Sequence, residues 1–178
     1  KIAIIKKTDE YIEAKALFEK AIEYDKKFIE SYAQKAITTF KMGHTEEAEE
    51  IIDEALETAE ELNNQQGKAK LLDAMGFLYA DSVKFKKAVK CFQNALKIYV
   101  KYEDQLAESK ALNNLSHCYI NLNKPDKGIE VLEKSIFLKE KLEKDNLLGS
   151  SLAQLGNAYR NKFQYAKAIT SYRKAIGK

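Results

Sequence analysis

The sequence has few residues that interrupt helices. One proline and seven glycines occur among 178 residues, and tryptophan is absent. Because proline and glycine are the strongest local interruptions of regular secondary structure, their scarcity predicts long helices. The remaining composition agrees with this, since it is rich in alanine, leucine, lysine and glutamate, which favour the helical state.

Cysteines, long apolar runs and a charge excess are also scarce. Two cysteines, Cys91 and Cys118, exclude a disulfide scaffold and predict reduced, packed thiols in a cytoplasmic protein. No apolar run approaches the roughly 20 residues that span a bilayer, and the opening Ile2-Ala-Ile-Ile5 is too short for a signal-peptide core. The chain begins at Lys1, so we expect a domain of a longer protein or a chain whose leader was removed.

One pattern of residues returns along the chain with a period of about 40 residues. On a first helix the pattern has two large residues, a small residue and a tyrosine. On a second helix it has a small, a large and a small residue. The copies, with a more closely spaced half-copy before the first full one, are Leu152/Leu155/Gly156/Tyr159/Ala168/Tyr172/Ala175, Leu112/Leu115/Ser116/Tyr119/Gly128/Leu132/Ser135, Leu72/Met75/Gly76/Tyr79/Ala88/Phe92/Ala95, Tyr32/Lys35/Ala36/Thr39/Ala48/Ile52/Ala55 and Ala14/Phe18/Ala21. Such a repeat predicts a solenoid in which each unit packs on its neighbours, with Tyr79, Tyr119 and Tyr159 in equivalent buried environments.

Apolar periodicity predicts where the helices lie. After a helical tail over residues 1–7, with a cap at Thr8, the expected ranges are about 8–25, 27–41, 45–62, 68–81, 84–103, 105–121, 125–144, 146–161 and 164–176. We expect Thr45 to cap its helix and Pro125 to lie in a first turn. A single solenoid over 1–178 would then comprise a partial repeat 1–26 and repeats 27–66, 67–106, 107–146 and 147–178.

The motif large-x2-Leu-Gly-x2-Tyr followed by Ala-x3-Phe-x2-Ala resembles the tetratricopeptide repeat family. That resemblance implies an all-α, right-handed α-solenoid of antiparallel helix hairpins, with a concave groove that holds peptides or partner domains. The family's usual period is shorter, at about 34 residues, so we expect the extra residues to lengthen the second helix. The long form is similar to Leu-Gly-Asn-repeat adaptors and bacterial tetratricopeptide regulators, and the tripeptide itself occurs at Leu155-Gly156-Asn157. Lys35 and Thr39 depart from the pattern, where Leu and Tyr are expected.

A second series of residues lies between the repeating positions of the first helices. Its members are spaced by three and four residues, which places each set on one helical stripe. They are Lys70, Asp73, Phe77 and Asp81; Asn113, His117 and Asn121; and Ala153, Asn157, Arg160 and Asn161. The resemblance implies that this stripe faces the concave groove, where amide side chains can bond the backbone of an extended peptide. We expect Asn113, His117 and Asn157 to converge there.

No motif for catalysis or cofactor binding occurs. The sequence has no glycine-rich phosphate loop, nucleophile elbow or His-Glu metal motif, so we predict no catalytic residue, no cofactor and no enzyme activity. His117 and Cys118 are adjacent, but neighbours on a helix point about 100° apart and do not converge on one ion. We therefore predict no metal site, and packing roles for both cysteines.

These observations predict a protein-interaction scaffold that binds a peptide or partner domain in the groove. The alternative is a peptide-sensing regulatory domain of a bacterial signalling or transcription-regulating protein. The net charge of +3 disfavours nucleic acid, which would require that charge to gather on the concave face. We expect no membrane partner. Because the chain stops directly after a repeat's second helix, Tyr172, Ala175 and Ile176 should form an apolar edge, covered by a further helix or by a second copy.

Overall fold

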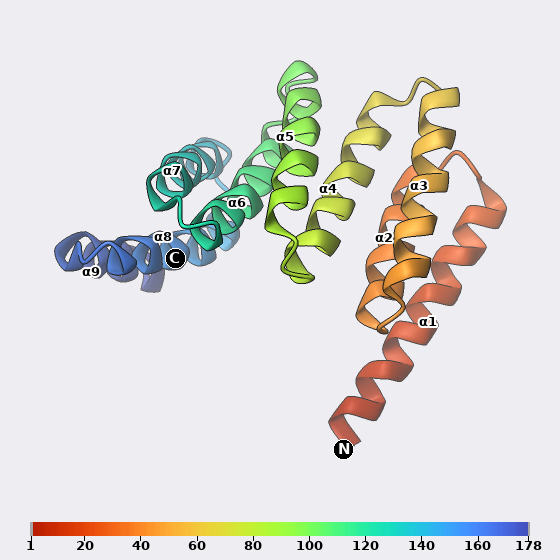
Figure 1. Ribbon diagram of the computed structural model, residues 1–178, viewed down its shortest axis with the longest axis horizontal. Helices are drawn as coiled ribbons and strands as arrows, with labels where there is room; N and C mark the ends of the chain where they lie inside the picture. The colour runs from red at the N-terminus through yellow and green to blue at the C-terminus, as the bar shows by residue number, and fades with distance from the viewer. Residues whose placement is uncertain (1, 178) are drawn as a thin grey trace. The chain divides into compact units, whose positions relative to one another are not determined.

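The computed structural model describes the backbone of residues 2–177 and the side chains of residues 9–177. Residues 2–177 form nine α-helices and no strand (Figure 1). The helices are α1 (Ile2–Tyr24), α2 (Ile29–Lys41), α3 (Thr45–Glu61), α4 (Gln65–Asp81), α5 (Phe85–Lys101), α6 (Gln105–Asn121), α7 (Pro125–Lys141), α8 (Asp145–Asn161) and α9 (Tyr165–Ile176). The predicted all-α class is confirmed.

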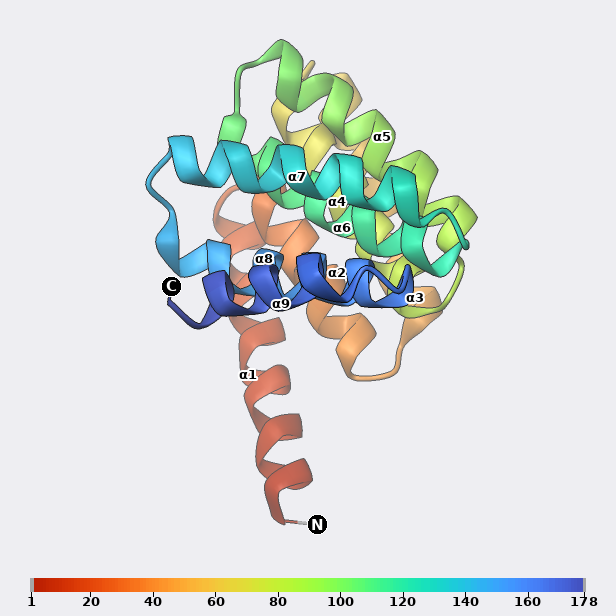
Figure 2. The same cartoon turned by 90° about the vertical axis from the view of Figure 1, so that its left-hand side faces the viewer.

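The chain divides into two compact units, Lys1–Val83 and Lys84–Lys178. In the first unit, α2 packs against α1, α3 and α4, and α3 also contacts α4. In the second unit, each helix from α5 to α9 packs on the next one along the chain, and α8 and α9 lie side by side in both views (Figures 1 and 2). The single solenoid and its repeat boundaries stay predictions.

From α2 onward, successive helices are joined by turns of three residues with one geometry. The middle residue has a positive φ in all seven turns, and these residues are Gly43, Asn63, Val83, Glu103, Asn123, Glu143 and Phe163. The third residue of a turn donates its N–H back into the preceding helix, as from Asn64 to the carbonyl of Ala59 at 2.8 Å. This is the Schellman arrangement, which satisfies carbonyl groups at the end of a helix.

Three expectations about the helices were wrong. The helices α4 to α7 each contain 17 residues, so in the α4–α5 and α6–α7 hairpins the second helix is no longer than the first. Helix α1 runs without a break from Ile2 to Tyr24, so no helix begins at Thr8. Thr45 is likewise the first helical residue, after His44 in the capping position. Pro125 does occupy the first turn of α7.

The small repeating positions mark close contacts between helices. A Cβ on Gly156 would lie 2.6 Å from the Tyr172 ring, and a Cβ on Gly128 would lie 2.7 Å from Ile120. Close approach of the paired helices therefore requires the absence of a side chain at these two positions.

The three repeating tyrosines were expected in equivalent buried environments, and each of them is half-buried: Tyr79, Tyr119 and Tyr159. The Tyr159 hydroxyl donates to Glu133 at 2.6 Å, and Tyr119 accepts from Gln93 at 3.0 Å. Both bonds reach a residue 26 positions earlier, on the second helix of the preceding hairpin. Tyr119 and Tyr159 therefore each join the first helix of one hairpin to the second helix of the hairpin before it.

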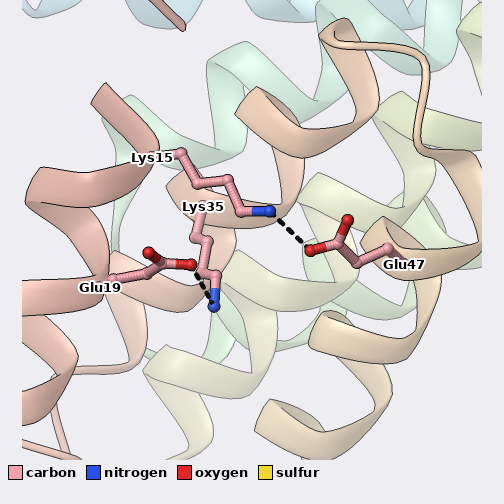
Figure 3. A network of polar contacts seen from close by, with 4 residues as sticks. All are labelled: Lys15, Glu19, Lys35 and Glu47. Carbon is pink, nitrogen blue, oxygen red and sulfur yellow. Dashed lines mark hydrogen bonds and ion pairs between the residues drawn. The ribbon is translucent and has the colours of Figure 1, made fainter. Parts of the chain in front are cut away.

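The departures from the pattern at Lys35 and Thr39 are accommodated differently. The Lys35 amino group lies 3.1 Å from Glu19 at the surface, while a second pair joins Lys15 to Glu47 at 2.6 Å (Figure 3). Lys35 therefore packs its aliphatic stem and keeps its charge near solvent. Thr39 is fully buried, and its hydroxyl has no hydrogen-bond partner within residues 9–177.

Candidate functional site

Helix α6 exposes only a narrow part of its surface. Its buried residues lie on most sides of the helix, and they are Glu108, Ser109, Ala111, Leu112, Leu115, Ser116 and Cys118. A polar stripe remains, which we call the α6 stripe and which consists of Lys110, Asn113, His117 and Asn121. Steps of three and four residues keep these side chains on one face. The α6 stripe therefore contains the three exposed residues of this helix, Lys110, His117 and Asn121, together with the half-buried Asn113.

Asn113 belongs to a polar cluster that joins three helices. Lys139 on α7 donates from Nζ to Ser151 Oγ on α8 at 2.6 Å. Ser151 donates in turn to Asn113 Oδ1 at 2.7 Å, and Lys139 Nζ lies 3.5 Å from the same oxygen. Ser151 is fully buried and Lys139 is 3% exposed, whereas Asn113 is half-buried. The cluster therefore connects the interior of the second unit to the α6 stripe.

Lys139 is a buried cation without an anionic partner. Within residues 9–177, no carboxylate lies within 4.0 Å of its amino group, whose hydrogen bonds go to Ser151 and Asn113 alone. Burial, assisted by the nearby positive charge of Lys110, lowers the pKa of Lys139 from 10.5 to about 8. A lysine with this pKa is still largely protonated at neutral pH, so its charge acts on the groups around it.

The other predicted residues of the second unit have separate environments. His117 is exposed and meets the Phe85 ring edge-on at 5.9 Å. Asn121 donates to the His117 carbonyl at 2.9 Å, and Asn157 Oδ1 accepts from the Tyr172 hydroxyl at 2.7 Å. Arg160 and Asn161 are exposed at the end of α8, as Asn157 also is. No hydrogen bond in the described part of the chain joins Asn113, His117 and Asn157, so their convergence stays a prediction.

The predicted residues of α4 lie in the first unit and make contacts of their own. Lys70 pairs with Glu30 on α2 at 2.8 Å. The Phe77 ring packs edge-on against Phe40 at 6.4 Å, with the Lys41 amino group 6.0 Å from its centre. Phe77 is thus half-buried and packed against Phe40, and its contact with a partner stays a prediction. Of the other two, Asp73 is half-buried and Asp81 is exposed.

Sequence reasoning missed Lys139 and Ser151. The repeat register offered a signal, because the positions equivalent to Lys139 in the two preceding repeats hold Ala59 and Tyr99, both of them buried. A lysine at a core position of a repeat is a local conflict, and such conflicts mark functional or strained sites. Ser151 gave no such signal, since small residues are frequent at packed positions of these helices.

The cysteines behave as packed side chains. Cys118 is fully buried, and burial raises the pKa of its thiol to about 11. Cys91 is half-buried, and burial raises its pKa as well. Both thiols are free, and residues 9–177 contain no group of three metal-ligating side chains. Within the described part of the chain, every helix is too short or too polar to span a bilayer.

A separate cavity of about 640 Å³ opens between α5, α6 and α7. Its lining residues include Leu96, Val100 and Leu112, which give it an apolar wall. The lining also includes Lys134, which pairs with the buried Glu108 at 2.7 Å. None of the residues predicted from the sequence to bind a partner lines this cavity.

Several known proteins are similar to the chain. The curated regulatory protein RapK of Bacillus subtilis is 32% identical over 97 residues, which cover 54% of this chain and 26% of RapK. The chain therefore spans about a quarter of the length of that relative. Two solved structures share the fold. BtubC from P. vanneervenii has a TM-score of 0.81 at 18% identity, with 98% of this chain and 73% of that chain covered. A Rap protein complexed with competence and sporulation factor has a TM-score of 0.82 at 17% identity, with 96% and 50% covered.

The family assignment comes from the sequence matches. Sequence models of the tetratricopeptide repeat family match residues 29–66, 109–141 and 149–177, which together make up more than half of the 178 residues. Those segments correspond to the α2–α3, α6–α7 and α8–α9 hairpins. The chain belongs to the tetratricopeptide repeat family.

Proposed function

We propose that the chain binds an extended peptide or a segment of a partner protein along the first helices of its later repeats, α6 and α8. The observation that carries this proposal is the α6 stripe, which is polar on a helix that is otherwise packed. His117 and Asn157, at equivalent positions of successive repeats, are both exposed. Amide and imidazole groups can bond the N–H and C=O groups of a peptide backbone, which gives affinity that tolerates different sequences.

The role that follows is a binding role without catalysis, and we propose that it is regulatory. RapK is named a regulatory protein, and the Rap structure holds a bound factor. By analogy, this chain would be the sensing part of a larger regulator, acting in the cytoplasm where free thiols persist. A passive adaptor module would bind its partner through the same stripe. The two roles differ in their effect, since ligand binding to a sensing domain alters the activity of the rest of the protein and binding to an adaptor does not.

The experiment that tests the binding surface is photo-cross-linking from defined positions in the parent cells. A photoreactive residue at position 117 should capture the partner, whereas one at the exposed Glu130 on α7 should not. The same photoreactive residue at position 117 is then placed in a double variant with Asn157→Ala and Asn121→Ala. Its yield of cross-linked partner should be several-fold to tenfold lower, since each lost hydrogen bond contributes about 0.5–1.5 kcal/mol. Equal capture from positions 117 and 130, with the fold intact, would contradict the proposed surface.

We also propose that the outer face of α9 is a contact between two copies of the chain. Of the apolar edge expected from the sequence, only Ile176 is exposed, because Tyr172 and Ala175 are half-buried. Ile169 and Tyr165 of the same helix are also exposed, while Ala168 and Ser171 are buried. A second copy could cover these apolar groups without any further component, because the same face would be present on both partners.

A further inference from the structure

The cavity between α5, α6 and α7 combines an apolar wall with one buried carboxylate. Leu96 and Leu112 line it, and so does Val100, which is 52% exposed although it is apolar. Among the described residues that line the cavity, Glu108 is the only acidic one, and it is 7% exposed. The cavity therefore offers a ligand an apolar surface together with a single anionic group.

The repeat pattern shows that this carboxylate stands at a core position. One period later the equivalent position holds Leu148, which is fully buried in a cluster with Ile136 and Leu152. The residues equivalent to Ile136 and Leu152 in the earlier repeat are Leu96 and Leu112, and both of them line the cavity. A charged residue at a core position is a local conflict, and such conflicts mark functional or strained sites.

The present partner of the buried carboxylate is a cation that can be displaced. Lys134 on α7 approaches Glu108 at 2.7 Å, and its side chain is 56% exposed whereas that of Glu108 is 9% exposed. Ion pairs of exposed lysines contribute little, so a ligand cation could replace Lys134 at small cost and keep Glu108 paired. An anionic ligand would instead draw Lys134 away and leave a buried carboxylate without a partner, which is strongly destabilising. The charges therefore favour a cationic ligand.

Lys97 is the other lysine that lines the cavity, and its amino group is held elsewhere. It lies 3.4 Å from Asn94 Oδ1, and Asn94 is not one of the lining residues. Lys97 is also exposed, so solvent and salt screen its charge from a ligand.

The cavity lies on the side of α6 away from the α6 stripe. Glu108 and Leu112 are four residues apart and share one face of the helix. Lys110 of the stripe is two residues from each of them, which is about 200° of helical rotation. A ligand in the cavity would therefore be separate from a peptide on the stripe.

We propose that this cavity binds a small aliphatic amine. Its chain would pack against Leu96, Val100 and Leu112, and its ammonium group would take the place of the Lys134 amino group beside Glu108. The volume of about 640 Å³ lies within the range of small-molecule sites. Lys134 itself illustrates the fit, because it brings an ammonium group on an aliphatic chain to this carboxylate.

The test uses n-hexylammonium chloride with the full chain at pH 7, where an alkylamine is protonated. Methyl resonances of Leu96, Val100 and Leu112 are followed by NMR, with n-hexanol as the neutral probe and sodium hexanoate as the anionic one at matched ionic strength. We expect saturable shifts with n-hexylammonium, and binding of the other two probes that is at least about tenfold weaker. The methylamide of acetyl-lysine represents a lysine of a partner protein. It should also bind at least about tenfold more weakly, because its amide groups would lie against the apolar wall.

Substitutions in the ion pair test the role of the carboxylate. Glu108→Gln keeps the shape and removes the charge, so n-hexylammonium should bind only as weakly as n-hexanol. Lys134→Met removes the competing cation and should tighten n-hexylammonium binding several-fold. Lys141→Met, on an exposed lysine of the same helix outside the cavity, is the matched control and should change nothing. Glu108→Leu serves as a second variant if Glu108→Gln folds poorly, since the next repeat has Leu148 at this position, and it should likewise lose the preference for the amine.

The proposal is overturned if n-hexylammonium causes no saturable shift, if n-hexanol or hexanoate binds as tightly, or if a folded Glu108 variant binds the amine as well as the unaltered chain. Equal or tighter binding of the acetyl-lysine derivative would assign the cavity to a partner protein and would also overturn it. None of these results bears on cross-linking from position 117, because that position lies on the α6 stripe.

Discussion

Lys139 makes the stability of the fold depend on pH. Because burial lowers its pKa to about 8, the folded chain releases this proton before the unfolded chain, whose lysine titrates near 10.5. Between these two values the unfolded state binds more protons, so stability should rise with pH by up to about 1.4 kcal/mol per pH unit. Below pH 8 both states carry the charge, and its burial is a constant cost.

The corresponding prediction concerns Lys139→Met. At pH 7 this substitution should stabilise the fold by on the order of 1–3 kcal/mol, since it removes an unpaired buried charge. The difference between the two proteins should shrink as the pH rises from 8 to 10, as measured by urea denaturation. Both proteins retain the Cys118 thiol and the Tyr159 phenol, whose raised pKa values act in the opposite direction, so the comparison isolates the lysine. A difference that does not change with pH would contradict this account.

Val83 occupies a backbone conformation that suits it poorly. Its φ is 61°, and a β-branched residue is a steric outlier in the left-handed region. Asparagine tolerates this region and already stands at the equivalent positions 63 and 123. We expect Val83→Asn to raise the free energy of unfolding by about 1 kcal/mol, read as an increase in melting temperature. Ser82→Asn, in the same turn but with a φ of −79°, is the matched control and should gain nothing.

At the scale of one helix, α8 carries two glycines with opposite roles. A Cβ on Gly156 would collide with the Tyr172 ring, which is held in place by its hydrogen bond to Asn157. A Cβ on Gly149 would meet nothing closer than the Ala175 carbonyl oxygen at 3.5 Å. Gly156→Ala should therefore destabilise the fold by about 1–3 kcal/mol. Gly149→Ala should stabilise it by about 0.5–1 kcal/mol through helix propensity alone. Equal effects in thermal denaturation would show that the α8–α9 contact is looser than described.

The sequence was sufficient to locate the elements, because their boundaries have local causes. Small residues such as Gly128 and Gly156 lie where helices approach, and Pro125 begins a helix as expected. Helix lengths were less accessible, since a period alone does not say how extra residues are divided between two helices. The Schellman turns were also hard to foresee, because residues such as Val83 and Phe163 stand at positive-φ positions where glycine or asparagine is the usual signal.

The candidate site was predictable only on the helix that carries it. The spacing of Asn113 and His117 predicted that they lie on one stripe of a helix, and in the structure both lie on α6, four residues apart. It could not reveal that Lys139 and Ser151 lie behind Asn113, because these contacts between distant parts of the sequence depend on how three helices pack. For the same reason the spacing did not foresee that Phe77 packs against Phe40.

At the scale of the whole molecule, the proposed contact through α9 predicts self-association. Ile169 is 51% exposed and Ile176 is 87% exposed. We expect a reversible dimer in analytical ultracentrifugation, and Ile169→Glu combined with Ile176→Glu should yield a monomer, because charges on an apolar contact are costly to bury. Ile12→Glu, on the similarly exposed Ile12 of α1, should not change the distribution. A monomer at every concentration would contradict the proposed contact.

The uniform three-residue turns have a consequence for genetic change. The helices from α3 to α8 have the same length, and the same type of three-residue turn joins them. Deletion or duplication of a whole hairpin between equivalent turns would therefore again leave each helix joined to the next by such a turn. Loss of residues 105–144, for example, would connect the turn before α6 directly to α8. The shortened protein would keep the architecture of hairpins but lose Asn113 and Lys139 together, and leave Ser151 alone. A hairpin of this chain can thus be deleted or duplicated as one unit. The cluster of Asn113, Lys139 and Ser151 forms only when α6, α7 and α8 are all present.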